Sequence, residues 1–382
     1  MKMLLILLAL LPGILAGAEP SQDIPDLPDP LVFLNGDRVT ATAQWPARRE
    51  EMRALLLEHE YGRVPPAPGN VRLEAELERG ARFDGAADFR AVRIAFGPDH
   101  GLSTTVHWYH PAGATAPAPV MLRFGLGGEH APAALARGYA FVCFEQTSLD
   151  PDTEGYDEAG PAQAAYPDCD WGSLAVWAWC ASRVMDYIET IPEVDSAKTV
   201  ITGHSRTGKA ALLAGALDER FALVAPNGSG AGGAALFRHK PKGIETLELI
   251  TRPDRFKSWF HADFGRFADN EAELPFDQHF LRALVAPRAV LSTDAYGDLW
   301  ANPEGTQRAW AAAQPVYDFL GVPDRNLLHV REGGHDQLPP DFAVLLDVAD
   351  AIFRDVATPE ELRRPYFPRD QMVDRRVPSP DA

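Results

Sequence analysis

The 382-residue chain is strongly acidic, with 54 acidic and 36 basic side chains and a formal net charge of −18. A surface of this charge repels nucleic acid and anionic membranes, so we expect neither as a partner. The three cysteines are too few for a disulfide-stapled fold and allow at most one disulfide. The length is enough for one large domain or two ordinary ones.

The N-terminus has the pattern of a cleaved signal peptide. A short positive region precedes an apolar run over residues 4–11, and Ala16-Gly-Ala18 is a small-x-small cleavage site. The apolar run is broken at Pro12 and is too short to span a bilayer. We therefore predict a signal peptide over 1–18, cleavage after Ala18, and a secreted or periplasmic protein without a membrane anchor.

The rest of the chain changes its periodicity twice. Residues 19–44 are rich in Pro and Asp and predict an extended segment, and 45–61 predict an amphipathic helix. Alternating residues between 71 and 110 predict antiparallel strands. From residue 119 onward, buried strands alternate with helices, which predicts a mostly parallel sheet with helices on both faces. The predicted strands are 120–124, 140–144, 199–202, 222–225, 289–292 and 327–330, and the helices are 173–191, 209–217 and 342–356.

The stretch Gly203-His-Ser-Arg-Thr-Gly-Lys209 lies between a predicted strand and a predicted helix. It nearly fits the phosphate loop G-x-x-x-x-G-K, but Ala210 stands where that loop needs Ser or Thr to hold magnesium. The predicted export also argues against a phosphate loop, because ATP and GTP are cytosolic. The alternative is a nucleophile elbow, with Ser205 on the strand-to-helix turn. We favour the elbow, which predicts an α/β-hydrolase three-layer sandwich.

This fold assignment sets the predicted domains. The catalytic domain covers 45–358, its N-terminal strands are antiparallel, and a C-terminal tail covers 359–382.

A serine nucleophile needs a histidine to accept its proton and a carboxylate to orient that histidine. Asp298 follows the predicted strand 289–292, and His335 follows the strand 327–330, which gives the order Ser, acid, His of this fold. Asp294, at the end of the first of these strands, is an alternative acid or a strand-end cap. Neither H-E-x-x-H nor clustered His and Cys residues indicate a metal site, so we expect no metal and no cofactor.

The elbow departs from G-x-S-x-G, because Thr207 takes the place of the second glycine, which comes one residue later. The backbone N–H of Arg206 would help to form the oxyanion hole, and its guanidinium could donate to the developing oxyanion. Lys209, one helical turn after Ser205, would face the same pocket. Two cations beside the nucleophile suggest a substrate with a carboxyl-derived group and several oxygens.

The elbow resembles that of the glucuronoyl esterases, carbohydrate esterase family 15, and the similarity to bacterial members extends over roughly residues 45 to 355. The other matching motifs are Trp171-Gly172, Trp177-Ala-Trp179, Ser229-Gly-Ala-Gly-Gly-Ala-Ala235, Leu274-Pro-Phe-Asp-Gln-His279 and Asp298-Leu-Trp-Ala-Asn-Pro303. The resemblance implies a serine esterase that cleaves 4-O-methyl-glucuronoyl esters between glucuronoxylan and lignin alcohols.

The resemblance also implies roles for particular residues. Ser205 would be the nucleophile that forms an acyl-enzyme, His335 the base and Arg206 the oxyanion stabiliser. Lys209, Glu245 and Trp300 would contact the uronic-acid sugar. Packing is an alternative role for Trp300, and a solvated helix position is an alternative for Glu245.

The chain departs from the family at the catalytic acid. Many members carry a glutamate just before the Ser-Gly-x-Gly-Gly motif, whereas this chain has Asn227-Gly228 before Ser229. The resemblance therefore leaves Asp298 as the acid. Two other functions stay open: a secreted carbohydrate esterase of the acetyl xylan esterase type, and a non-catalytic glycan-binding relic. We expect a monomer.

Overall fold

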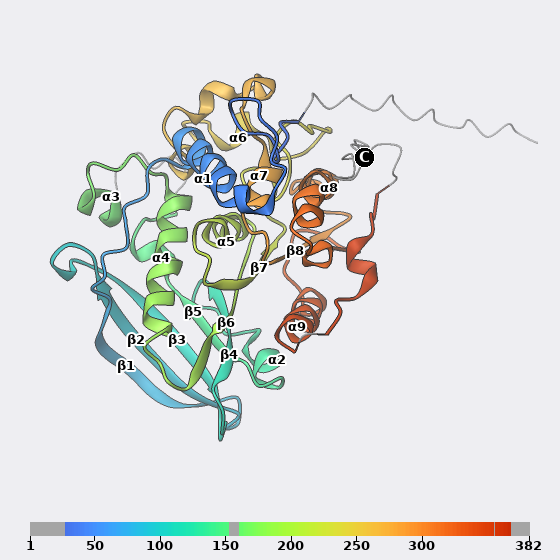
Figure 1. The fold of residues 1–382 in the computed structure, drawn as a ribbon. Coiled ribbons are helices and arrows are strands. Elements are labelled where there is room, and N and C mark those ends of the chain that lie inside the picture. Colours follow the sequence, from blue (N-terminus) through green and yellow to red (C-terminus); the bar gives the residue numbers. More distant parts are fainter. Residues whose placement is uncertain (1–26, 153–159, 355, 368–382) are drawn as a thin grey trace, which may run out of the picture.

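The computed structural model describes residues 27–152, 160–354 and 356–367 (Figure 1). Its centre is a nine-stranded sheet with the order β1-β2-β3-β5-β4-β6-β7-β8-β9. The pairs from β1 to β5 are antiparallel, and all pairs from β5 to β9 are parallel. This is the mixed, mostly parallel sheet of an α/β-hydrolase and confirms the predicted fold class. The strands are β1 (Arg72–Arg82), β2 (Ala87–Phe96), β3 (Leu102–Pro111), β4 (Ala118–Phe124), β5 (Ala140–Phe144), β6 (Val194–His204), β7 (Phe221–Asn227), β8 (Ala289–Ala295) and β9 (Asn326–Arg331).

The sheet separates two hydrophobic cores. Successive side chains of a strand point to opposite faces, so Val120 and Leu122 of β4 belong to one core and Met121 to the other. The first core includes α1, α4, α5 and α7, and the second includes α2 and α9. The two cores give the three-layer sandwich. The helices are α1 (Trp45–Leu56), α2 (Ala131–Leu135), α3 (Pro161–Ala165), α4 (Ser173–Ile188), α5 (Arg206–Leu217), α6 (Leu247–Ile250), α7 (Gln278–Ala283), α8 (Pro303–Phe319) and α9 (Pro339–Phe353).

The predicted elements appear in the expected order, with shifted ends. The helix predicted over 45–61 stops at Leu56 and continues as a π-helical turn to Tyr61. The closing helix runs over Pro339–Phe353 instead of 342–356. The pattern missed α8, a 17-residue helix that contains Pro315.

Both ends of the described chain pack against the domain. The predicted signal peptide lies outside the described residues, but Leu27, Leu31 and Val39 of the extended segment are buried. Within the predicted tail, Leu362 is buried, and residues 368–382 lie outside the described range. In the ranges that the structure covers, no helix has the length and apolar character needed to cross a membrane.

The three cysteines are free thiols, so the one disulfide that the sequence allowed is not formed. Cys143 is buried in β5, the core strand predicted for it.

Candidate active site

Ser205 lies on a strained turn between β6 and α5. Its φ of 56° and ψ of −125° are unusual for a residue with a side chain, and such a conformation costs about 1–3 kcal/mol. A Cβ on Gly203 would lie 2.3 Å from the carbonyl oxygen of Thr207, so the turn requires glycine there. This strand-turn-helix geometry is that of a nucleophile elbow.

The displaced glycine of the elbow has a structural reason. The Thr207 hydroxyl accepts a hydrogen bond from His204 N (3.0 Å) and donates one to His204 O (2.8 Å), which fastens the turn across its base. A Cβ on Gly208 would lie 2.8 Å from Asn227 O, so glycine at this position lets α5 approach β7. Thr207 therefore closes the turn with two hydrogen bonds, and Gly208 lets helix α5 pack against β7.

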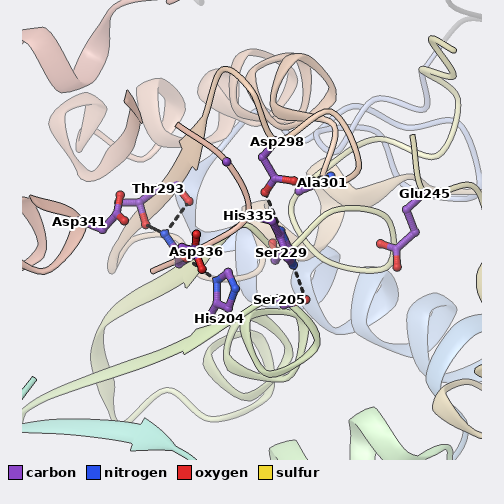
Figure 2. Close-up of polar contacts among 12 residues, drawn as sticks. His204, Ser205, Ser229, Glu245, Thr293, Asp298, Ala301, His335, Asp336 and Asp341 are labelled. Carbon is purple, nitrogen blue, oxygen red and sulfur yellow. Dashed lines mark hydrogen bonds and ion pairs between the residues drawn. The ribbon is translucent and has the colours of Figure 1, made fainter. Parts of the chain in front are cut away.

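The structure brings Ser205, His335 and Asp298 together in one hydrogen-bonded chain (Figure 2). His335 Nε2 lies 2.9 Å from Ser205 Oγ, and His335 Nδ1 lies 2.7 Å from Asp298 Oδ2. Asp298 is buried, and its other oxygen accepts the backbone N–H of Ala301 (3.2 Å). The hydrogen bond to Asp298 raises the pKa of His335, as a base for Ser205 requires. The parallel strands β6, β8 and β9 place all three residues at their carboxyl ends.

Asp294 is buried near Asp298 but does not bond His335. Its Oδ1 has no hydrogen-bond partner among the described residues. Burial, with a smaller contribution from the neighbouring Asp298 charge, raises the pKa of Asp294 to about 7. The hydrogen-bond geometry thus favours Asp298 over Asp294 as the acid.

Arg206 is held from two sides. Its Nη1 donates to both carboxylate oxygens of Asp152 (3.1 and 3.0 Å). Its guanidinium carbon lies 5.1 Å from the ring centre of Phe256 and 5.0 Å from that of Trp259, within the range of cation–π contacts. No acceptor among the described residues bonds its Nε or Nη2. The guanidinium is therefore held by an ion pair on one side and by aromatic rings on the other.

Lys209 has a different environment. It is buried, and its Nζ donates to Ser229 O (2.7 Å), Ala231 O (2.6 Å) and Glu245 Oε2 (2.6 Å). An ammonium has three N–H donors, so all of them are in use. Burial lowers the pKa of Lys209, and the Glu245 carboxylate opposes that shift.

Glu245 forms a buried ion pair with Lys209 and also contacts Trp300. Its side chain is buried and its backbone N–H donates to Trp300 O (2.9 Å). The alternative of a solvated helix position for Glu245 is therefore wrong, since the residue also precedes α6. Trp300 is 38% exposed, so much of its side chain remains accessible.

The sequence patterns did not identify Asp152, Phe256 or Trp259. These residues lie far from the elbow in sequence, and nothing in their local pattern signals a contact with Arg206. The one available signal was Arg206 itself, because a partly buried cation needs a partner.

Among the described residues, no group of three or more His, Cys, Asp or Glu side chains is placed to hold a metal ion.

The fold, the strained serine and the hydrogen-bonded His335 and Asp298 have the arrangement found in serine hydrolases of the α/β-hydrolase class. A family model described as glucuronyl esterase of fungi matches residues 97–321. The chain belongs to the glucuronoyl esterases, carbohydrate esterase family 15, as the elbow resemblance predicted.

Individual relatives agree with this family. A carbohydrate esterase from an unknown prokaryotic organism is 34% identical over 85% of this chain and 89% of its own length. The 4-O-methyl-glucuronoyl methylesterase of Schizophyllum commune is 32% identical over 81% of this chain and 77% of its own. A solved family 15 glucuronoyl esterase from Caldicellulosiruptor kristjansonii is 33% identical, with a TM-score of 0.78 over 91% of this chain and 96% of that one.

Proposed function

We propose that the chain is a serine esterase that hydrolyses 4-O-methyl-glucuronoyl esters of glucuronoxylan. The hydrogen-bonded chain from Ser205 through His335 to Asp298 is the observation that carries this proposal. Membership of the glucuronoyl esterase family supports the substrate class.

In the first half of the reaction, Ser205 Oγ attacks the ester carbonyl carbon and His335 Nε2 takes the hydroxyl proton. Asp298 stabilises the resulting imidazolium through Nδ1. The Arg206 backbone N–H and guanidinium stabilise the negative oxygen of the tetrahedral intermediate. The carbon–oxygen bond to the alcohol then breaks, and the alcohol leaves with the proton from His335.

The second half releases the acid. Water attacks the acyl group on Ser205 and gives a proton to His335. The bond to Ser205 breaks, the proton returns to Oγ, and the uronic acid leaves. The same three side chains thus serve both halves.

The sugar contacts follow from the exposure of each residue. The exposed part of Trp300 offers apolar surface that suits a pyranose, and the Glu245 backbone N–H is hydrogen-bonded to the Trp300 carbonyl. Because the donors of Lys209 are in use, we assign it an indirect role, in which it holds Glu245 and the Ser229–Ala235 segment in place.

We further propose that the alcohol side of the ester belongs to lignin, and that the protein is secreted as a monomer without a membrane anchor after cleavage behind Ala18. The signal-peptide pattern of residues 1–18 supports export.

Turnover of benzyl glucuronate and of a simple acetate ester tests the function. We expect faster turnover of the glucuronate and loss of both activities in Ser205→Ala. Preference for acetate would instead support an acetyl xylan esterase. Saccharide binding without any turnover by the wild type, unchanged in Ser205→Ala, would support a glycan-binding relic.

A further inference from the structure

A second histidine lies against the catalytic histidine. The ring centres of His204 and His335 are 4.7 Å apart and their planes are inclined by 46°. His204 is the last residue of β6 and directly precedes Ser205. The mechanism proposed above gives it no part in proton transfer.

The orientation of His204 is fixed by a short hydrogen-bonded chain (Figure 2). Asn227 Nδ2 donates to Thr293 O (3.1 Å) and to Thr293 Oγ1 (2.7 Å), which turns Asn227 Oδ1 toward His204 Nδ1 at 2.6 Å. An amide oxygen can only accept, so His204 Nδ1 must carry the proton. The chain thus runs across the carboxyl ends of β6, β7 and β8.

His204 is held as a neutral ring at this position. Burial lowers the pKa of His204, and the Asn227 hydrogen bond and the Asp298 charge oppose this shift without cancelling it. A neutral ring can remain in contact with His335 when that residue becomes an imidazolium, whereas two imidazolium rings would repel each other.

His335 needs such a contact because its own loop restrains it little. It follows Gly333 and Gly334, and its side chain is 36% exposed. Its hydrogen bonds to Ser205 and Asp298 hold the two ring nitrogens, but they do not themselves fix rotation of the ring about the line between these nitrogens, which the glycine-containing loop restrains only through Cβ. Contact with the tilted His204 ring restricts that rotation further.

We propose that His204 is a positioning residue for His335: its ring, fastened by Asn227 and Thr293, restricts rotation of the catalytic imidazole about the line from Ser205 to Asp298. This inference rests on the proposed esterase function. It predicts an effect on the chemical step and little effect on substrate binding.

The test compares kcat and KM on benzyl glucuronate for the wild type, His204→Ala, His204→Phe and Asn227→Ala. A misplaced catalytic group can lower the rate by up to about 100-fold, so we expect kcat of His204→Ala to fall about 10- to 100-fold with KM unchanged. His204→Phe keeps a flat ring but loses the hydrogen bond to Asn227, so its kcat should lie between those of His204→Ala and the wild type. Asn227→Ala also leaves the ring present but unfastened, and its kcat should lie in the same intermediate range.

His130 provides a matched control, since it is a buried histidine whose ring stacks on Phe342 in the other core. His130→Ala should lower the melting temperature without changing kcat. If His204→Ala does not fold, His204→Leu takes its place, because leucine fills the space without a planar ring.

Two outcomes would overturn the inference: wild-type kcat in folded His204→Ala, or an equal loss of kcat in His204→Phe and His204→Ala. Inactivity of the wild type on glucuronate esters would instead contradict the proposed function.

Discussion

The β6–α5 junction carries two cations, and β8 with the loop after it carries two buried carboxylates. The two regions accommodate buried charge differently. At the junction, Lys209 is paired with the Glu245 carboxylate and two carbonyl oxygens. In β8, Asp294 Oδ1 has no hydrogen-bond partner among the described residues, and burial raises the pKa of Asp294 to about 7. The buried Lys209 is thus compensated by the opposite charge of Glu245, whereas burial of Asp294 favours its neutral, protonated form.

In the proposed mechanism, the second residue of each pair belongs to the catalytic apparatus. Asp298 bonds His335, and Arg206 directly follows Ser205, with its Nε and Nη2 unpaired within the part of the chain that the structure describes. The hydrogen-bond partners distinguish the two members of each pair, and substitutions can test the distinction.

The largest effect should come from Asp298→Ala. Without this carboxylate, His335 loses the group that orients it and stabilises its charged form, and we expect kcat to fall by about 10⁴-fold. The measurement is steady-state turnover of benzyl glucuronate, with Asp294→Ala as the matched variant. Near-wild-type turnover in Asp298→Ala, together with loss in Asp294→Ala, would make Asp294 the acid.

The next effect is on stability. Lys209→Met leaves Glu245 buried without its counter-charge, which should cost about 3–5 kcal/mol in the free energy of unfolding. Urea unfolding measures this cost. A second substitution, Glu245→Leu, removes the unpaired charge and should restore part of the stability. If Lys209→Met unfolded like the wild type, the pair would not be buried as the structure has it.

Arg206→Ala should affect the rate more than the stability. Loss of one oxyanion donor lowers kcat by about 10²- to 10³-fold. The ion pair with Asp152 is partly exposed, so the free energy of unfolding should change by no more than about 1 kcal/mol. Arg63, which forms an exposed ion pair with Asp170, supplies the control, and Arg63→Ala should leave kcat unchanged. An Arg206→Ala enzyme with wild-type kcat would remove the guanidinium from the mechanism.

The sequence could predict the parts of the site that depend on local order along the chain. The elbow, the acid and the histidine each follow a strand, and parallel strands bring their carboxyl ends to one edge of the sheet. The fold class followed from the same alternation of strands and helices. These inferences needed no knowledge of side-chain packing.

The contacts between distant segments could not be predicted in this way. Asp152 and Trp259 meet Arg206 only through the tertiary fold, and Lys209 is enclosed by acceptors from a later loop. The helix α8 was missed because Pro315 lies inside it and argues locally against a helix. Local propensity also placed a continuous helix over 45–61, where the chain changes to a π-helical turn at Leu57.

The smallest effect on rate should come from Asp294→Asn, and its signature is a dependence of stability on pH. Between its ordinary pKa of 3.8 and the raised value of about 7, the folded protein keeps a proton on Asp294 that the unfolded chain has lost. This carboxyl therefore destabilises the fold increasingly as the pH rises through that window. Asparagine cannot ionise, so the variant should gain stability relative to the wild type from about pH 4 to pH 7 and keep a constant difference above. Urea unfolding across this range measures the difference, and kcat at pH 7 should stay within about twofold of the wild type. Parallel stability profiles for the two proteins would show that Asp294 is ionised in the fold, and that the carboxyl end of β8 and the loop after it hold two charged carboxylates.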